Sequence, residues 1–121
     1  MEEYRVIIAG GREFDDYGLL KDKCRYLLSS KIVTNKVIII SGHAKGADNL
    51  GERFAKEFRL QYEIHPADWC RHGKAAGHIR NAEMAEISDA LIAFWDGKSH
   101  GTAHMIKTAQ TKGLKVTVIK Y

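Results

Sequence analysis

The stretch KVIIISGHAKGAD, residues Lys36–Asp48, joins an apolar run to a loop of small residues, and this junction decides the fold. The run Lys36–Ile40 is mostly β-branched and shows no polar alternation, which is typical of a strand buried on both faces of a parallel sheet. The loop places Gly42 and Gly46 where almost any polar residue could have turned the chain, so we expect something to approach its backbone closely. Helical apolar spacing begins at Ala47. A buried strand, a glycine loop and a helix in succession predict an α/β fold.

The same alternation of strand and helix continues along the whole chain. Short apolar runs predict strands at Arg5–Ala9, Lys36–Ile40, Gln61–His65, Ala90–Phe94 and Val116–Ile119. Helical spacing is present between them at Leu20–Leu28, Ala47–Phe58, Ala76–Ile87 and Ile106–Gln110. Successive parallel strands are joined by right-handed crossovers, which favour one topology. We therefore predict a Rossmann-like three-layer α/β sandwich with a five-stranded parallel sheet in the order 3-2-1-4-5.

The composition is typical of one small globular domain. The 121 residues are 45% hydrophobic, which suffices for one core, so we expect a single domain spanning residues 1–121. The net charge is +4, but Lys and Arg are scattered among acids, which fits an anionic ligand and forms no nucleic-acid-binding run. The acidic start MEE and the lack of a bilayer-length apolar stretch lead us to expect a cytoplasmic protein with no membrane partner.

Three glycine-bearing turns follow strands 1, 2 and 4 of the predicted sheet. They are GGREF (Gly10–Phe14), SGHAKGAD (Ser41–Asp48) and WDGKSHGT (Trp95–Thr102). In the predicted strand order, all three lie at the carboxyl edge, and strands 1 and 4 border the crevice where such sheets bind ligands. Small residues there let backbone N–H groups and helix N-termini face an anion. The turns therefore predict a phosphate-binding crevice.

The common nucleotide-binding fingerprints are absent. The turn GGREF lacks the spacing G-x-G-x-x-G, and strand 2 ends in Ser41 where a dinucleotide-binding fold places an acid for the ribose. The turn GKSHGT lacks the Lys-Ser/Thr pair of a P-loop. These departures disfavour a hydride-transferring NAD enzyme, a kinase and an NTPase, and no cofactor is predicted.

Several motifs, in this order and spacing, resemble the SLOG superfamily, in its YspA-like, YpsA-related branch. They are GGREF, SGHAKGADNLGERFA, PADW, GKAAGHIRNAEM and SDALIAFWDGKSHGTAHMI, and they cover nearly the whole chain. The resemblance implies a Rossmann-like domain that binds a nucleotide or an NAD-derived molecule. The superfamily also contains the LOG phosphoribohydrolases, often labelled lysine-decarboxylase-like, and the DprA DNA-processing proteins.

The chain departs from the LOG pattern where that pattern implies catalysis. LOG enzymes carry Pro-Gly-Gly-x-Gly-Thr-x-x-Glu, whereas this chain has Asp96–Gly97 at the start of the motif and Met105 in place of the Glu. Arg80, which matches the LOG arginine on the preceding helix, is retained. A second departure is His43, where relatives commonly have Gly, which indicates either a specific hydrogen bond or a bulkier neighbour. The resemblance thus implies a binding or sensing module, with no catalytic residue assigned.

We predict that a small nucleotide-type ligand binds in the crevice. The guanidinium groups of Arg12 and Arg80 are expected to form bidentate hydrogen bonds with phosphate oxygens. Asp48 could oppose a helix dipole, pair with an arginine or accept from a ribose hydroxyl, and Trp69 and Phe14 could pack in the core or stack on a base. The full set of predicted ligand-binding residues is Gly10, Gly11, Arg12, Phe14, Ser41, Gly42, His43, Ala44, Gly46, Asp48, Trp69, Arg80, Asn81, Asp96, Gly97, Ser99, Gly101 and Thr102.

Two other functions remain as alternatives. A LOG-like hydrolase would need another carboxylate, for which Asp96, Asp68 and Glu83 are candidates. DprA-like binding of single-stranded DNA would use GKAAGHIRN, but that segment lacks interleaved aromatic residues and a basic stripe, so a nucleic-acid partner is not predicted. Formation of a homo-oligomer stays open.

No metal site is predicted from the histidines and cysteines. His100 and His104 are four residues apart, but His100 is expected to precede its helix, and Cys70, His72 and His78 form only a loose cluster. Neither arrangement has the ligand spacing that a zinc site typically shows.

Overall fold

A parallel sheet flanked by helices organises the computed structural model, which describes residues 1–121. Its elements are β1 (Glu3–Gly10), α1 (Tyr17–Thr34), β2 (Lys36–Ser41), α2 (Ala47–Glu57), β3 (Gln61–Ile64), α3 (Trp69–His72), the 3₁₀ helix η1 (Gly73–Ala75), α4 (Ala76–Glu86), β4 (Ala90–Trp95), α5 (His100–Thr111) and β5 (Lys115–Lys120). The strands follow the order β3-β2-β1-β4-β5 and all pair in parallel. Both the predicted fold class and the predicted strand order are confirmed.

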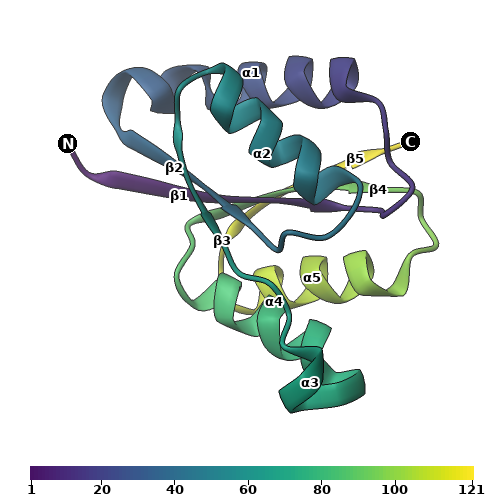
Figure 1. Cartoon of the computed structure of the whole chain (residues 1–121). Helices are drawn as coiled ribbons and strands as arrows, with labels where there is room; N and C mark the ends of the chain where they lie inside the picture. The colour runs from purple at the N-terminus through teal and green to yellow at the C-terminus, as the bar shows by residue number, and fades with distance from the viewer.

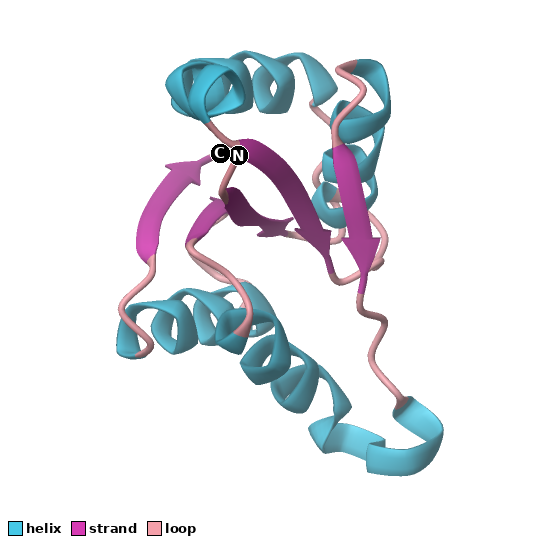
Figure 2. Cartoon of the chain, turned by 90° about the vertical axis from the view of Figure 1, so that its left-hand side faces the viewer, coloured by secondary structure: helices cyan, strands magenta, loops and turns pink.

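The helices cover both faces of the sheet. Helices α1 and α2 lie on one side and α4 and α5 on the other, as Figures 1 and 2 show. Side chains alternate along β1, so that Val6 and Ile8 pack under α1 and α2 while Ile7 and Ala9 pack under α4 and α5. The continuous apolar runs in the sequence are therefore explained by central strands that are buried on both faces.

Two local features differ from the predictions. The α3–η1 segment was not predicted, and it lies apart from the sheet in Figure 2. Asp68 begins it, because its carboxylate caps α3 by accepting from the backbone N–H of Arg71 at 3.0 Å. The expectation that His100 precedes its helix was wrong, since α5 begins at His100 and Ser99 is the N-cap.

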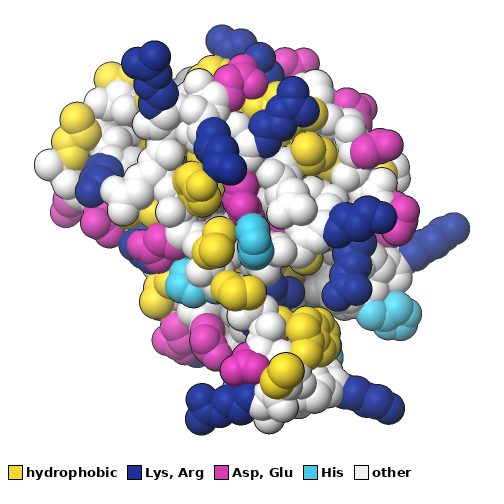
Figure 3. Space-filling view, in the orientation of Figure 1, with side chains coloured by type: hydrophobic (Ala, Val, Ile, Leu, Met, Phe, Trp, Pro, Cys, Tyr) yellow, Lys and Arg dark blue, Asp and Glu magenta, His cyan; other side chains and the backbone are white.

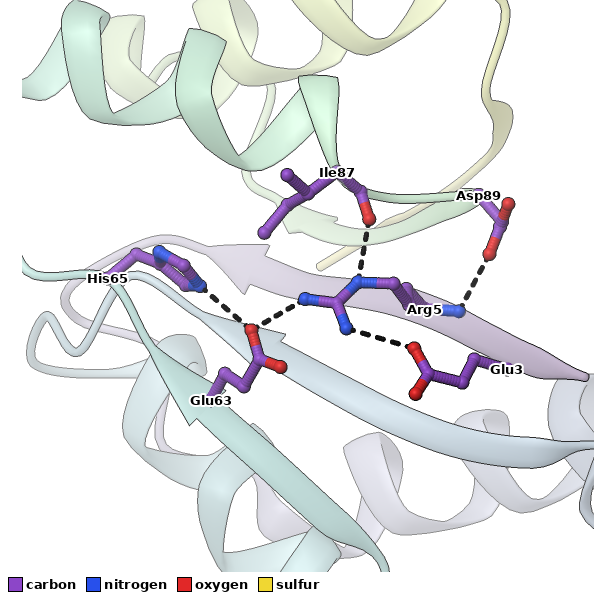
Figure 4. A network of polar contacts seen from close by, with 6 residues as sticks. All are labelled: Glu3, Arg5, Glu63, His65, Ile87 and Asp89. Carbon is purple, nitrogen blue, oxygen red and sulfur yellow. Dashed lines mark hydrogen bonds and ion pairs between the residues drawn. The ribbon is translucent and has the colours of Figure 1, made fainter.

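An arginine network ties β1 to its neighbours on the α4 side of the sheet (Figure 4). The Arg5 guanidinium donates to the carboxylates of Glu63 at 2.6 Å and Glu3 at 3.3 Å, and its Nε donates to the carbonyl oxygen of Ile87 at 2.7 Å. Its backbone N–H donates to Asp89 at 2.9 Å. One side chain thus joins β1, β3 and the C-terminal end of α4.

No helix in the structure combines the length and the apolar character needed to cross a bilayer.

Candidate ligand-binding site

A cleft of about 430 Å³ opens at the carboxyl edge of the sheet, where the predicted glycine turns lie. This edge is on the right in Figure 1, beside the first turn of α5. Twelve of the predicted ligand-binding residues line the cleft: Gly10, Gly11, Arg12, Ala44, Asp48, Trp69, Arg80, Asn81, Asp96, Ser99, Gly101 and Thr102. The fold therefore brings together residues from three strand-to-helix loops and from α4, although their binding to a ligand stays a prediction.

The other predicted residues lie outside the lining of the cleft. Phe14 packs in the core, with its ring centroid 5.0 Å from that of Phe94 and 4.7 Å from that of Tyr121, so its role is structural here. Gly46 has φ +90, and a Cβ there would collide with the backbone of Gly11 and Arg12. Gly97 also needs its positive φ of +84. These glycines are required by backbone geometry.

Gly42 allows Arg80 and Asp48 to meet beside the β2–α2 loop. A Cβ on Gly42 would collide with the Arg80 guanidinium and would lie 2.7 Å from Oδ2 of Asp48. The carbonyl oxygen of Gly42 accepts a 2.6 Å hydrogen bond from Nη1 of Arg80. The small residue after Ser41 is thus explained by the close approach of a side chain from α4, in addition to any ligand.

Arg80 is held in place by polar contacts but has no carboxylate within ion-pair distance. Its Nε donates to Oδ1 of Asn81 at 3.1 Å, and the amide of Asn81 lies 3.2 Å from Nδ1 of His104. Burial lowers the pKa of Arg80, and the nearby charge of Arg12 also lowers it, against the opposing effect of Asp48. No protein acceptor pairs with Nη2 of Arg80, which leaves a free charged donor at the cleft.

Asp48 is a buried acid in the first turn of α2, with 5% of its surface exposed. Burial raises its pKa to about 6, although the backbone N–H of Ala44 and the charge of Arg80 favour the ionised form. Its Oδ2 accepts from the Ala44 N–H at 3.3 Å, and it forms no ion pair with Arg12 or Arg80 within 4.0 Å. A carboxyl whose pKa is raised by burial in a cleft is typical of a functional position.

His43 forms the specific hydrogen bond that was one of its two expected roles. It has a left-handed backbone with φ 60, which explains why glycine suits this position, and its Nδ1 lies 2.8 Å from Oε2 of Glu52. Glu52 is buried, and the same oxygen accepts from the Ser41 hydroxyl at 2.7 Å. Ser41 and His43 therefore stabilise the loop from behind the cleft.

The first turn of α5 lies at the cleft, which Ser99, Gly101 and Thr102 line. Ser99 caps this helix by accepting from the Thr102 N–H at 3.5 Å, which leaves the N–H groups of His100 and Gly101 without side-chain acceptors. A Cβ on Gly101 would meet nothing within 4 Å, so the space beside it is open. Asp96 accepts from the Ser99 and Lys98 N–H groups at 2.8 Å each, which lowers its pKa and orders the loop.

Eight further residues line the cleft and were not predicted as binding residues. They are Ala9, Glu13, Lys74, Gly77, His78, Met84, Met105 and Tyr121. Lys74, Gly77 and His78 belong to the segment GKAAGHIRN, from which only Arg80 and Asn81 were predicted to bind the ligand. Tyr121 follows β5 at the same carboxyl edge, so the predicted topology was a usable signal for it. Its hydroxyl would collide with a Cβ on Gly11, which explains that glycine.

The remaining candidates for catalysis and for metal binding are dispersed. Asp68 caps α3, Glu83 is outside the cleft, and only Asp96 of the three alternative carboxylates lines it. No group of three or more His, Cys, Asp or Glu side chains is arranged to hold a metal ion. His78 and His104 stack with ring centroids 3.8 Å apart, and burial and the charge of His78 lower the pKa of His104. On the face in Figure 3, Lys and Arg are scattered among other side chains and form no continuous stripe.

Comparison with known proteins identifies relatives over most of the chain. Residues 4–72 match the model of a family described as the YspA, cpYpsA-related SLOG family. The Gene 61 protein of Mycobacterium phage D29 is 35% identical over 120 residues, and the match covers 93% of each chain. The X-ray structure of TM1055 superposes with a TM-score of 0.65 at 19% identity, covering 96% of this chain and 72% of that one, which shows a shared fold.

Proposed function

This chain belongs to the YspA, cpYpsA-related SLOG family, and from that premise we propose that it binds a nucleotide or nucleotide-derived ligand through its phosphate. The phosphate would lie at the first turn of α5, against the N–H groups of His100 and Gly101. The Thr102 hydroxyl lies at the same turn. Helix N-termini favour anions because their N–H groups are unpaired and the helix dipole is positive there.

The observation that carries this proposal is the free Nη2 donor of Arg80 beside that helix N-terminus. Asn81 connects the two, because its side chain accepts from Arg80 and its amide lies 3.5 Å from the carbonyl oxygen of Gly101. A phosphate between them would accept from Nη2 of Arg80 and from the helix N–H groups together. Arg12, which is exposed, also lines the cleft and supplies a second cation. Charge-assisted contacts of this kind are the stronger hydrogen bonds of proteins.

Binding without efficient turnover is supported by the residue that replaces the LOG glutamate. Met105 lines the cleft, is 2% exposed, and has no charge with which to stabilise a ribosyl cation. Loss of one electrostatic stabiliser of a transition state commonly costs about 3 kcal/mol, or two to three orders of magnitude in rate. Chromatography of the protein incubated with AMP should therefore show no adenine release at ordinary enzyme turnover.

Calorimetric titration tests the binding proposal directly. Wild type and Arg80→Ala would be titrated with AMP, ADP-ribose and cyclic nucleotides, and the variant should lose about 1.5 to 3 kcal/mol of binding free energy. Arg53→Ala is a matched control, because Arg53 lies on α2 with its guanidinium 3.9 Å from the Tyr17 ring centroid and does not line the cleft. Equal affinities for wild type and Arg80→Ala would show that the cleft is not the phosphate site.

A further inference from the structure

Trp69 is a large apolar side chain left half open at the cleft. It lines the cleft from α3 with 52% of its surface exposed, whereas Phe14, Phe54 and Phe94 are all buried. Exposed aromatic rings that border a polar cleft are the usual surfaces for stacking ligands. The helix α3 lies apart from the sheet in Figure 2, so Trp69 takes no part in the hydrophobic core.

The indole is nevertheless held in a defined place. Trp69 is the first residue of α3, directly after the capping Asp68, so the backbone that carries it is ordered. The Cη2 atom of Trp69 would lie 3.6 Å from a Cβ on Gly77, which places the ring over the first turn of α4. Gly77, Lys74 and His78 line the same end of the cleft. The α3–α4 end therefore presents an aromatic surface with polar groups beside it.

We propose that Trp69 is the stacking surface for an aromatic base, so that the ligand class is a base-bearing nucleotide and excludes simple sugar phosphates. The inference rests on the proposed function, because the phosphate at α5 fixes one end of the ligand and the base occupies the α3–α4 end. A cleft of about 430 Å³ lies within the usual range for small-molecule sites. Stacking accepts any base, while Lys74 and His78 offer hydrogen bonds to its edge.

Two probes separate base recognition from phosphate recognition: AMP and ribose 5-phosphate. Calorimetry would compare wild type, Trp69→Leu and Trp69→Phe, with Tyr26→Leu as a control because Tyr26 is an exposed aromatic on α1 away from the cleft. We expect Trp69→Leu to weaken AMP binding about tenfold, a size typical of one base stacked on one aromatic ring. It should leave ribose 5-phosphate affinity unchanged, and Trp69→Phe should retain most of the AMP affinity.

The other possible outcomes would contradict either base stacking on Trp69 or the phosphate site. Equal weakening of both probes by Trp69→Leu would mean that Trp69 only supports the α3–α4 wall, and unchanged AMP affinity would mean that no base stacks there. Wild type that binds ribose 5-phosphate as tightly as AMP would remove base recognition while leaving the phosphate site intact. Failure of both probes to bind wild type would overturn the proposed function and this inference together.

Discussion

Two arginines are associated with α4, and their surroundings differ in a way that separates stability from binding. Arg5 approaches the C-terminal end of α4, where each nitrogen of its guanidinium has one acceptor, from two carboxylates and one carbonyl oxygen. Arg80 projects from the middle of α4, with neutral hydrogen-bond acceptors only and with Nη2 unpaired. Every nitrogen of the Arg5 guanidinium therefore has a protein acceptor, whereas Nη2 of Arg80 has none and is free to bind a ligand.

The pKa directions of the two regions agree with this comparison. Hydrogen bonding to Glu63 raises the pKa of Arg5, and the same contact lowers the pKa of Glu63, so both groups are stabilised in their charged forms. At the cleft, burial lowers the pKa of Arg80 and raises that of Asp48, so both charged forms are disfavoured there. Ionisable groups whose pKa values are shifted by burial at a cleft are typical of binding and catalytic sites.

The largest expected effect is a loss of stability in Arg5→Ala, which tests whether Arg5 has a structural role that Arg80 lacks. Removing the guanidinium leaves the Ile87 carbonyl oxygen unpaired and two carboxylates without their cation, so the free energy of unfolding should fall by about 3 kcal/mol. Arg5→Lys should recover part of this loss, because it keeps the charge but not the fork geometry. Urea denaturation measures all of these values.

Arg80→Ala is the matched counterpart in the same denaturation series. Its unfolding free energy should change by less than about 1 kcal/mol, because relief of a buried charge offsets the lost hydrogen bonds. Arg5→Ala should in turn bind AMP as wild type does. A similar destabilisation by both alanine variants would contradict the division between a structural and a binding arginine.

A second effect, of about 2 kcal/mol, concerns the pH dependence of stability at Asp48. Its folded pKa of about 6 lies above the usual value, so the folded protein binds more protons than the unfolded chain between about pH 4 and pH 6. Ionisation of Asp48 therefore destabilises the fold as pH rises through that window. The stability of Asp48→Asn relative to wild type should increase by about 2 kcal/mol between about pH 4 and pH 7.

Asp96→Asn provides the control from the same cleft. Backbone N–H groups lower the pKa of Asp96, so its stabilising contribution is present above the usual carboxyl pKa and is lost as pH falls. The stability of Asp96→Asn relative to wild type should thus change with pH in the opposite direction. Denaturation midpoints measured across the range would contradict the assignment if both variants followed the same trend.

The fold could be predicted from the sequence because its signals are local. Continuous apolar runs mark β1, β2 and β4, and these runs exist only because the strands are covered on both faces. The α3–η1 segment was missed because only Trp69 and the capping Asp68 distinguish it, and a four-residue helix is too short to show a periodic pattern. The elements that form the core were thus predicted, whereas the α3–η1 segment, which packs sparsely, was not.

The site was predictable in location more than in detail. Glycine turns at strand ends identified the cleft edge, because the topology alone brings those ends together. The side-chain contacts that fix Asp48 and Arg80 depend on which atoms meet across Gly42, and Tyr121 reaches Gly11 from the end of an edge strand. Distances of this kind join residues far apart in the chain, and one sequence carries no pattern for them.

The smallest expected effect concerns the hydrogen bond between His43 and Glu52, near the cleft. This bond should also contribute to the stability of the fold. His43→Ala removes the hydrogen bond to Glu52 and keeps the left-handed backbone, so unfolding free energy should fall by about 1 to 2 kcal/mol. His43→Gly removes the same bond but relieves the backbone, which is worth about 1 kcal/mol, so its stability should lie close to that of wild type. Chemical denaturation would resolve the two variants.

Arg59 supplies the control for the backbone part of this argument. It too is left-handed, with φ 55, but it is exposed and its side chain forms no hydrogen bond. Arg59→Gly should therefore stabilise the protein by about 1 kcal/mol, because strain is relieved and no contact is lost. If His43→Gly stabilised the protein equally, the His43–Glu52 pair would contribute nothing. The hydroxyl of Ser41 would then be the hydrogen-bond partner of Glu52 that matters for stability.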